Sequence, residues 1–199
     1  MTADDLLALL RRRRSPYAFD PAPVADADLA RAFEAARWAP SSYNEQPWRF
    51  VVGRRGEPAY DAILGTLTGH NPTWARTAPV LGVVAVAETF ARAGRPNAHA
   101  RYDAGAAMMA LSLAAAALGL GVHQMAGVEG GAVAEALGVP DGFGVAVAFA
   151  LGRPAPDPAA LVPAELAARA TSPKPRRPLA ETVFAAWGRP LLPAPPYAP

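Results

Sequence analysis

Ala39-Pro-Ser-Ser-Tyr-Asn-Glu-Gln-Pro-Trp-Arg-Phe50 is the stretch around which the rest of this sequence is arranged. Pro40 ends a predicted helix, because its ring removes a hydrogen-bond donor and restricts the residue before it. Pro47 forces an extended exit into a strand predicted from Trp48. Between the two prolines lie short polar side chains, namely Ser41, Ser42, Asn44, Glu45 and Gln46. Such a segment suits a flat ligand with polar edges, and the alternative is an ordinary solvated loop.

The composition predicts one folded globular domain over residues 1–199, since this length supports one substantial core. Hydrophobic residues make up 52% of the chain and charged residues 18%. A formal net charge of +2 is too small to indicate a nucleic-acid partner. The absence of cysteine excludes disulfides and thiolate metal sites, and His70, His99 and His123 lack metal-ligand spacing.

No signal peptide is expected, because the first ten residues contain two aspartates and the arginines follow the apolar residues. The segment 104–122 carries no charge and has nearly the length of a membrane span. Its alanines and glycines give weak hydropathy, and Gly119-Leu-Gly121 interrupts it. We therefore predict a helix buried on all sides, in a core or a subunit interface, and a soluble, cytoplasmic protein without a membrane segment.

The hydrophobic pattern predicts an α+β fold with a central mixed or antiparallel sheet flanked by helices. Continuous apolar runs at 80–86 and 143–151 are typical of strands covered on both faces. The other expected elements are a strand at 48–53, a strand or turn at 122–128, and helices at 2–12, 26–39, 59–67, 72–77, 133–137 and 179–187.

The composition of three connecting segments indicates how each of them is structured. The polar, arginine-containing segment 88–97 has the length of a lid, which extends to residue 101 if the following charged residues belong to it. Segments 153–163 and 172–178 are proline-rich loops. The tail 188–199 is also proline-rich, and its Leu191 and Leu192 require a surface to pack against.

A second polar signal is Arg11-Arg-Arg-Arg14-Ser15. Guanidinium groups and a hydroxyl suit a phosphate, because paired N–H donors match its oxygens. The alternative is that these arginines complement a helix C-terminus and stay solvated. A smaller cluster of Lys174, Arg176 and Arg177 leaves the same two interpretations open.

The sequence shows no catalytic side-chain pattern. Gly127, Gly130 and Gly131 lack dinucleotide-binding spacing, and there is no Walker loop. No Ser-His-Asp order or nucleophile elbow is present either. If the protein is an enzyme, its reactive atoms therefore belong to a cofactor.

Taken in order, these pieces resemble the flavin-dependent nitroreductase family. Arg13-Arg14-Ser15 followed by Phe19-Asp20 is similar to the family's phosphate-binding motif, and Ala39-Pro-Ser-Ser-x-Asn-x-Gln-Pro-Trp48 to its most specific signature. Other matches follow along nearly the whole chain: Asn71 before Ala78-Pro79, Asp103-x-Gly105, Gly119-Leu-Gly121, Gly152 and Lys174-Pro-Arg176.

The resemblance implies an intertwined homodimer with one FMN in each of two shared sites. One subunit would supply Arg13, Arg14, Ser15, Asn71, Lys174 and Arg176. The other would supply Pro40, Ser41, Ser42 and Asn44. Backbone groups of Met125, Ala126 and Gly127 would face the flavin ring near its reactive N5. The helix at 104–122 would form the dimer core, and the tail would strap onto the partner.

The implied activity is an FMN-dependent NAD(P)H oxidoreductase without a catalytic side chain. In a ping-pong cycle, NADH or NADPH would pass a hydride to flavin N5, and a nitroaromatic, quinone or similar electrophile would then take the electrons. Alternatives are a specialised relative (a dehalogenase, an azoline oxidase or a flavin-fragmenting enzyme), a non-catalytic flavin sensor, or a purely structural protein. Lid residues Arg92, Arg95, His99 and Arg101 either attract an anionic substrate or nicotinamide phosphate or stay solvated, and we expect His123 to be a turn residue.

Tyr17 departs from the family pattern, which has Arg or Lys two positions after the motif serine. Such a cation stabilises negative charge on the reduced flavin, whereas a tyrosine donates a hydrogen bond but carries no charge at neutral pH. Unless Arg14 or another arginine supplies the charge, we predict a lower two-electron potential than in relatives that have the cation. Redox titration measures this, and a potential equal to or above theirs would refute it.

Overall fold

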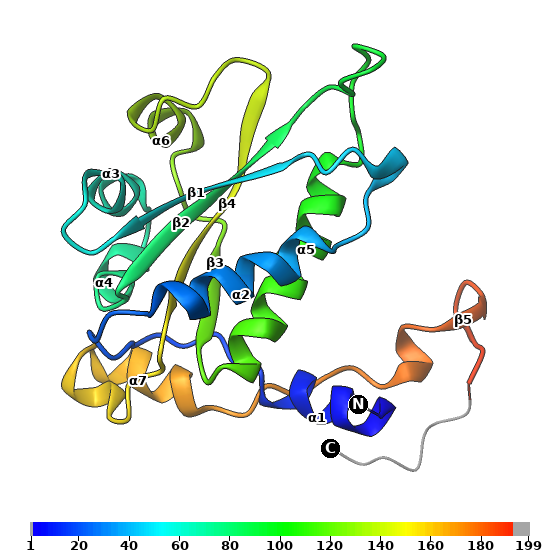
Figure 1. The fold of residues 1–199 in the computed structure, drawn as a ribbon. Coiled ribbons are helices and arrows are strands. Elements are labelled where there is room, and N and C mark those ends of the chain that lie inside the picture. The colour runs from blue at the N-terminus through cyan, green and yellow to red at the C-terminus, as the bar shows by residue number, and fades with distance from the viewer. Residues whose placement is uncertain (1, 193–199) are drawn as a thin grey trace.

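The computed structural model describes residues 2–192 and contains a four-stranded sheet (Figure 1). The strand order is β1-β2-β4-β3, and every neighbouring pair is antiparallel. The strands are β1 Trp48–Arg54, β2 Val80–Ala87, β3 Gly121–Met125 and β4 Phe143–Gly152. The predicted α+β class is confirmed, and this sheet is purely antiparallel rather than mixed.

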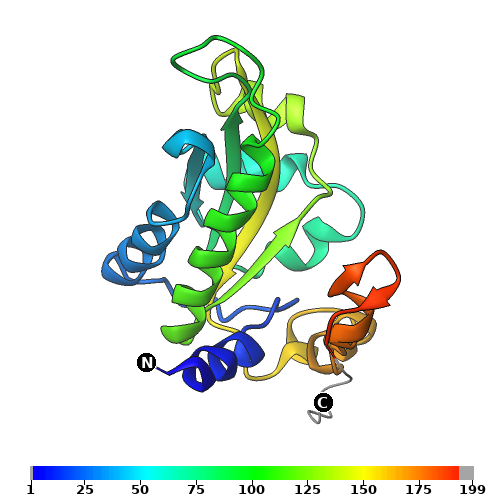
Figure 2. The ribbon, with the colours of Figure 1, turned by 90° about the vertical axis from the view of Figure 1, so that its right-hand side faces the viewer.

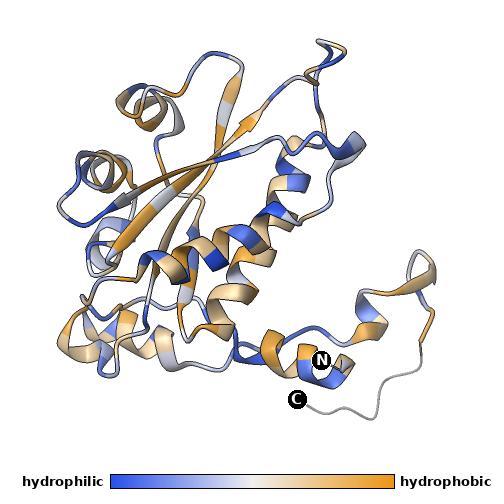
Figure 3. Ribbon diagram, in the orientation of Figure 1, coloured by the Kyte–Doolittle hydropathy of each residue, from blue (hydrophilic) through white to orange (hydrophobic). Residues whose placement is uncertain are grey.

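The two apolar runs form the centre of the sheet. All of β2 is buried except its last residue, and Val80 pairs with Leu151 of β4. Figure 3 shows the apolar character of these central strands. Burial of both faces explains why β2 lacks the polar alternation of a half-exposed strand.

Helices cover both faces of the sheet and create two cores (Figures 1 and 2). On one face, α2 Asp26–Arg37 and α5 Ala100–Ala117 enclose a core that includes Leu111 and Phe149. On the other face, Trp74 and Ile63 belong to a second core. The helices of that side are α3 Pro58–Thr66, α4 Asn71–Ala75, α6 Gly130–Ala136 and α7 Ala164–Thr171. The sequence pattern did not lead us to expect α7, which buries only Leu166.

The first helix, α1 Ala3–Arg12, is held at its start by a reciprocal cap. The Asp5 backbone N–H donates to Thr2 Oγ1 at 3.1 Å, and the Thr2 N–H donates to Asp5 Oδ2 at 2.7 Å. This arrangement satisfies two donors that a helix start leaves free. No residue of α1 is fully buried, and among residues 2–192 Leu6 and Leu7 stay exposed, whereas Leu9 and Leu10 are partly buried.

The bounds predicted for α5 are wrong. The helix occupies 100–117 rather than 104–122, because Gly119 adopts a left-handed φ of 74° and Val122 already belongs to β3. Within one chain the helix is not covered on all sides, since Tyr102 is 82% exposed and Met109 is 38% exposed. Burial on all sides by one core is therefore not observed among residues 2–192, and burial in a subunit interface stays a prediction.

The helix predicted at 179–187 is wrong as well. A single 3-10 turn, η3 Leu179–Glu181, leads into a hairpin of β5 Phe184–Ala186 and β6 Arg189–Pro190. Aromatic and β-branched residues disfavour a helix here, and Gly188 makes the turn with a φ of 76°. This C-terminal arm, residues 172–192, extends away from the sheet (Figure 1).

The longer connections are 13–25, 88–99 and 153–163. The segment after β2 folds back on itself through a bridge between Thr89 and Pro96, and η2 Pro158–Ala160 lies in the expected proline-rich loop. Of the expected tail 188–199, residues 193–199 lie outside the described residues. Within residues 2–192, no helix has the length and apolarity that crossing a membrane requires, and no cluster of metal ligands occurs.

Candidate cofactor site

A cavity of about 420 Å³ lies between the segment after α1, the middle of α5, strand β3 and the C-terminal arm. Its lining combines cationic, hydroxyl and apolar side chains from parts of the chain that are far apart in sequence. The lining residues are Arg13, Ser15, Met109, Ser112, Val122, His123, Gln124 and Arg176.

The cations at this cavity have no acidic partner within residues 2–192. None of the ion pairs between described residues involves Arg13, Lys174 or Arg176. Arg13 instead donates to Ser15 Oγ at 3.3 Å, and Arg176 donates to the Lys174 carbonyl at 2.7 Å. Burial lowers the pKa of Arg13, with added repulsion from Arg176 and Arg14. The positive charges of these side chains are close together and are not neutralised by a carboxylate. Such a site suits an anionic group such as a phosphate.

Two members of the predicted phosphate set do not line the cavity. Arg14 is exposed and contributes only its charge next to Arg13. Lys174 is also exposed, and its ammonium group donates to the Arg169 carbonyl at 2.9 Å. The structure therefore brings Arg13, Ser15 and Arg176 together directly, with Arg14 and Lys174 at the border.

At the wall of the cavity, His123 joins a cluster of aromatic rings. Its ring stacks on Trp74 at 4.2 Å between centroids, and Tyr17 meets it edge-on at 4.7 Å. His123 Nδ1 lies 2.7 Å from the Pro16 carbonyl, so Nδ1 carries the proton and donates it. The expectation that His123 is a turn residue is wrong, because it lies within β3 and fixes the segment that carries Arg13 and Ser15.

Burial lowers the pKa of His123 below its ordinary 6.5, outweighing the raising effect of the Pro16 hydrogen bond; Lys174 lowers it further. The unfolded chain therefore binds a proton on His123 at a higher pH than the folded chain does. Below about pH 6.5 this linkage favours unfolding, and its contribution grows as the pH falls toward the folded-state pKa. Between pH 7.5 and 5.5 we expect the unfolding free energy to fall more in the wild type than in His123→Gln. Denaturant titration at both pH values measures this, and equal losses would contradict it.

Asn71 and the turn after β3 also meet. Asn71 Nδ2 donates to the Gly127 carbonyl at 3.1 Å, and the Thr68 N–H donates to the same oxygen at 3.0 Å. A Cβ on Gly127 would lie only 2.7 Å from Asn71 Nδ2, so a larger residue here would displace the Asn71 side chain from this hydrogen bond. The structure thus places Asn71 beside the predicted ring-facing turn, in which Met125 is buried and Ala126 is exposed.

The loop between Pro40 and Pro47, which contains η1 Ser42–Asn44, holds an unusual backbone. Tyr43, Asn44 and Gln46 all adopt positive φ, at 53°, 55° and 48°. Each such residue costs about 1–3 kcal/mol unless its surroundings compensate, and strain of this kind concentrates at functional sites. The compensation is visible, since buried Asp103 accepts from the Ser42 N–H at 3.0 Å and Ser41 Oγ accepts from the Gln46 N–H at 2.9 Å.

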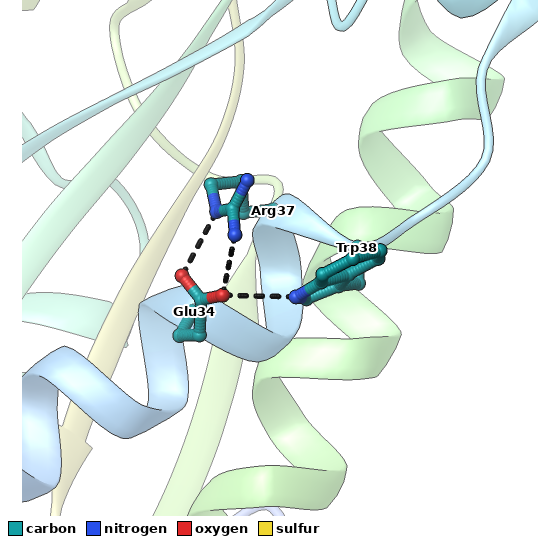
Figure 4. A network of polar contacts seen from close by, with 3 residues as sticks. All are labelled: Glu34, Arg37 and Trp38. Atoms are coloured by element: carbon teal, nitrogen blue, oxygen red, sulfur yellow. Dashed lines mark hydrogen bonds and ion pairs between the residues drawn. The ribbon is translucent and has the colours of Figure 1, made fainter.

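A neighbouring contact fixes the entrance to this loop (Figure 4). Glu34 accepts from Arg37 at 2.6 and 2.8 Å and from Trp38 Nε1 at 2.8 Å. These hydrogen bonds lower the pKa of Glu34 to about 2. The Trp38 ring is thereby oriented although it is 75% exposed.

The loop 41–46 and the cavity meet α5 at different heights in one chain. The loop bonds to Asp103 in the first turn, whereas the cavity meets the middle of the helix at Met109 and Ser112. Six and nine residues of helix separate these positions from Asp103, which is about 9 and 13 Å along the axis. Figure 1 shows the loop beside the upper end of α5 and α1 below its lower end.

Sequence reasoning did not select several residues that line the cavity. Met109 and Ser112 belong to a helix whose sequence indicates packing rather than binding, and Val122 and Gln124 belong to an edge strand. Nothing in the type or spacing of these four residues indicates a ligand site. The segment 122–128 was predicted as a strand or a turn, and the structure has β3 Gly121–Met125 there. The position of β3 beside Ser15 depends on contacts between residues more than a hundred positions apart, such as the hydrogen bond from His123 to Pro16.

Comparison with known proteins agrees with this geometry. The model of the nitroreductase family matches residues 10–153. A Streptomyces coelicolor protein, provisionally named an NADH dehydrogenase/NAD(P)H nitroreductase, is 39% identical over 83 residues. That match covers 42% of this chain and 41% of the relative, so the matched part spans less than half of the relative's length.

Solved structures match over most of the chain. An oxidoreductase containing FMN is 35% identical, with a TM-score of 0.82 and coverage of 89% of each chain. A Desulfovibrio desulfuricans protein, provisionally named a nitroreductase and solved in complex with FMN, is 28% identical, with a TM-score of 0.75. That match covers 93% of this chain and 98% of the other. With its sheet order, its signature loop and these matches in agreement, this chain belongs to the nitroreductase family.

Proposed function

We propose that the protein binds FMN and uses NADH or NADPH to reduce a nitroaromatic, a quinone or a similar conjugated electrophile. The observation that carries the proposal is the cationic cavity, in which Arg13 and Arg176 meet Ser15 without an acidic partner. The FMN found in two similar solved structures and the nicotinamide in the name of a relative support the choice of cofactor and reductant. Reduced nicotinamides are cytoplasmic metabolites, so we propose that location.

The residues at the cavity fit the phosphate of FMN. Arg13, Ser15 and Arg176 would hold it, with Arg14 and Lys174 adding charge at the border. Asn71 and the Met125–Gly127 turn would lie along the ring, and Tyr17 would reach it from the aromatic cluster. When bound, FMN supplies two-electron transfer between the nicotinamide and the acceptor.

The protein's own part in this function is binding, orientation and exclusion of water. Burial of Arg13 and the aromatic cluster behind it provide a preformed, partly dry wall for the ligand. The hydrogen bond from Asn71 holds the Gly127 backbone in place before any ligand arrives. No proton transfer by a side chain is required, which agrees with the lack of a catalytic pattern in the sequence.

We also propose a homodimer in which each site is shared. Two α5 helices packed antiparallel would bring the 41–46 loop of one subunit, with Pro40, Ser41, Ser42 and Asn44, beside the cavity of the other. The uncovered face of α5 suits this packing, because Tyr102, Gly105 and Met109 follow one another at helical spacing and are exposed. The oriented Trp38 ring and the exposed apolar residues of the arm supply further contact surface.

The test is an absorbance spectrum of the purified protein, followed by anaerobic addition of NADH or NADPH and then a quinone. We expect a flavin band that the nicotinamide bleaches and the quinone restores. A band that nicotinamide cannot bleach would contradict the NAD(P)H oxidoreductase and favour a sensor. A colourless protein that takes up no added FMN would overturn the proposed function, and a monomer by sedimentation would overturn the shared site.

A further inference from the structure

A second pocket, of about 460 Å³, lies where the strained 41–46 loop meets the 88–97 connection. It lies outside the cationic cavity described above and shares none of its residues. A hydrogen bond joins its two walls, since Glu45 Oε1 accepts from the Ala91 N–H at 2.6 Å. The residues that matter for its chemistry are Tyr43, Glu45, Phe90, Arg92 and Arg95.

The pocket has an aromatic surface. The rings of Tyr43 and Phe90 meet edge-on with centroids 5.8 Å apart. Phe90 is buried, but Tyr43 is 82% exposed even though its backbone has a φ of 53°. A bulky residue seldom adopts this conformation, and an exposed ring returns little hydrophobic stabilisation for it. The strained backbone therefore holds an aromatic ring in contact with solvent. An exposed ring held in this way is typical of a binding surface.

The same pocket is positively charged. The Arg95 guanidinium lies 5.1 Å from the Phe90 centroid and 6.0 Å from that of Tyr43, so aromatic faces hold it in position. None of the ion pairs between described residues involves Arg92 or Arg95. Glu45 is the only carboxylate among the lining residues, and one of its oxygens is already bonded to Ala91. Two cations against one carboxylate leave a net positive charge.

We propose that this pocket binds a flat aromatic group that carries a negative charge and so selects the substrate. The proposal rests on the proposed function, because Tyr43 and Asn44 belong to the loop that would line the FMN site. Two sources share the required chemistry. One is an electron acceptor with a carboxylate on its ring, and the other is the adenosine 2′-phosphate end of NADPH. A planar ring would lie against Tyr43 while the anion pairs with Arg92 and Arg95.

Calorimetric titration of the oxidised, FMN-loaded dimer without reductant separates the two sources. The first probe pair is 4-nitrobenzoate and its neutral analogue 4-nitrobenzamide. The second is adenosine 2′,5′-bisphosphate and adenosine 5′-monophosphate. We expect the more negative member of at least one pair to bind about tenfold tighter, the effect of one charge-assisted contact. The pair that shows the preference identifies the source.

Matched variants test the residues. The double variant Arg92→Gln/Arg95→Gln should remove the preference, and Tyr43→Leu should weaken both members of the responding pair. Arg31→Gln, at an exposed arginine on α2, should leave the affinities unchanged. The proposal is overturned if neither pair discriminates by charge, or if the double variant keeps the discrimination. The flavin spectrum of each variant and its bleaching by NADPH are recorded in parallel, so failure of FMN binding is distinguished from failure of this pocket.

Discussion

Replacing Trp74 with alanine is expected to lower the free energy of unfolding by about 3–5 kcal/mol, the usual cost of truncating a large buried aromatic. Trp74 is 1% exposed and lies in the core beneath the sheet. Its ring stacks against His123 on one side and Phe19 on another, at 4.2 and 6.4 Å between centroids. The cavity left by alanine would be lined by rigid rings and strands that cannot collapse into it.

Denaturant unfolding monitored by circular dichroism measures this loss. Trp74→Phe keeps an aromatic ring in the core and should lose clearly less. Leu161→Ala is a surface control, because Leu161 is 43% exposed, and its effect should stay within about 0.5 kcal/mol. A Trp74→Ala protein as stable as this control would show that the Tyr17–Trp74–His123 cluster contributes little to the fold.

The second large effect is expected on cofactor affinity. Arg13→Ala should weaken FMN binding by about 1.5–3 kcal/mol, because it removes a charge-assisted contact to phosphate. That corresponds to a dissociation constant roughly 10- to 150-fold higher. Fluorescence titration of FMN into the apoprotein measures the change. Arg13 is selected because it lines the cavity, is partly buried and already bonds to Ser15.

Two variants provide the comparison. Arg14→Ala removes the same charge from an exposed position that does not line the cavity, so its effect should be smaller. Ser41→Ala should also weaken FMN binding, but less than Arg13→Ala. In the proposed dimer Ser41 would act from the partner subunit, and within its own chain it supports the strained loop by accepting a hydrogen bond from the Gln46 N–H. If neither Arg13→Ala nor Ser41→Ala changes the affinity, the proposed site is wrong.

The parts of the fold that the sequence predicted well are those with local signals. Continuous apolar runs located β2 and β4, and prolines marked both ends of the 41–46 loop. The start of α5 was misplaced because its first turn, residues 100–103, is charged and was assigned in part to the preceding lid, and its end because the apolar residues continue past Gly119 into β3. The helix predicted at 179–187 was wrong because its β-branched and aromatic residues favour the hairpin that Gly188 turns.

Site prediction failed where function depends on contacts distant in sequence. His123 forms a hydrogen bond with the carbonyl of Pro16, which is 107 residues away in the sequence. No local sequence pattern predicts that hydrogen bond. The positive φ at Tyr43 is also unexpected from its side chain, since this conformation is uncommon outside glycine, asparagine and aspartate. By contrast, Arg13, Ser15 and Arg176 do line one cavity. The sequence could offer them as candidates for a phosphate site because a cation or a hydroxyl group indicates such chemistry by its residue type alone.

The arm that leaves the sheet has a thermodynamic consequence. Trp187 is 96% exposed and Leu191 is 59% exposed, so the arm has little reason to hold its shape alone. If a second copy provides the cover, mass action applies, and the melting temperature should rise with protein concentration. Removing residues 179–199 should flatten that dependence in scanning calorimetry. Dilution would then act on this protein as a mild denaturant, and its stability would have meaning only at a stated concentration.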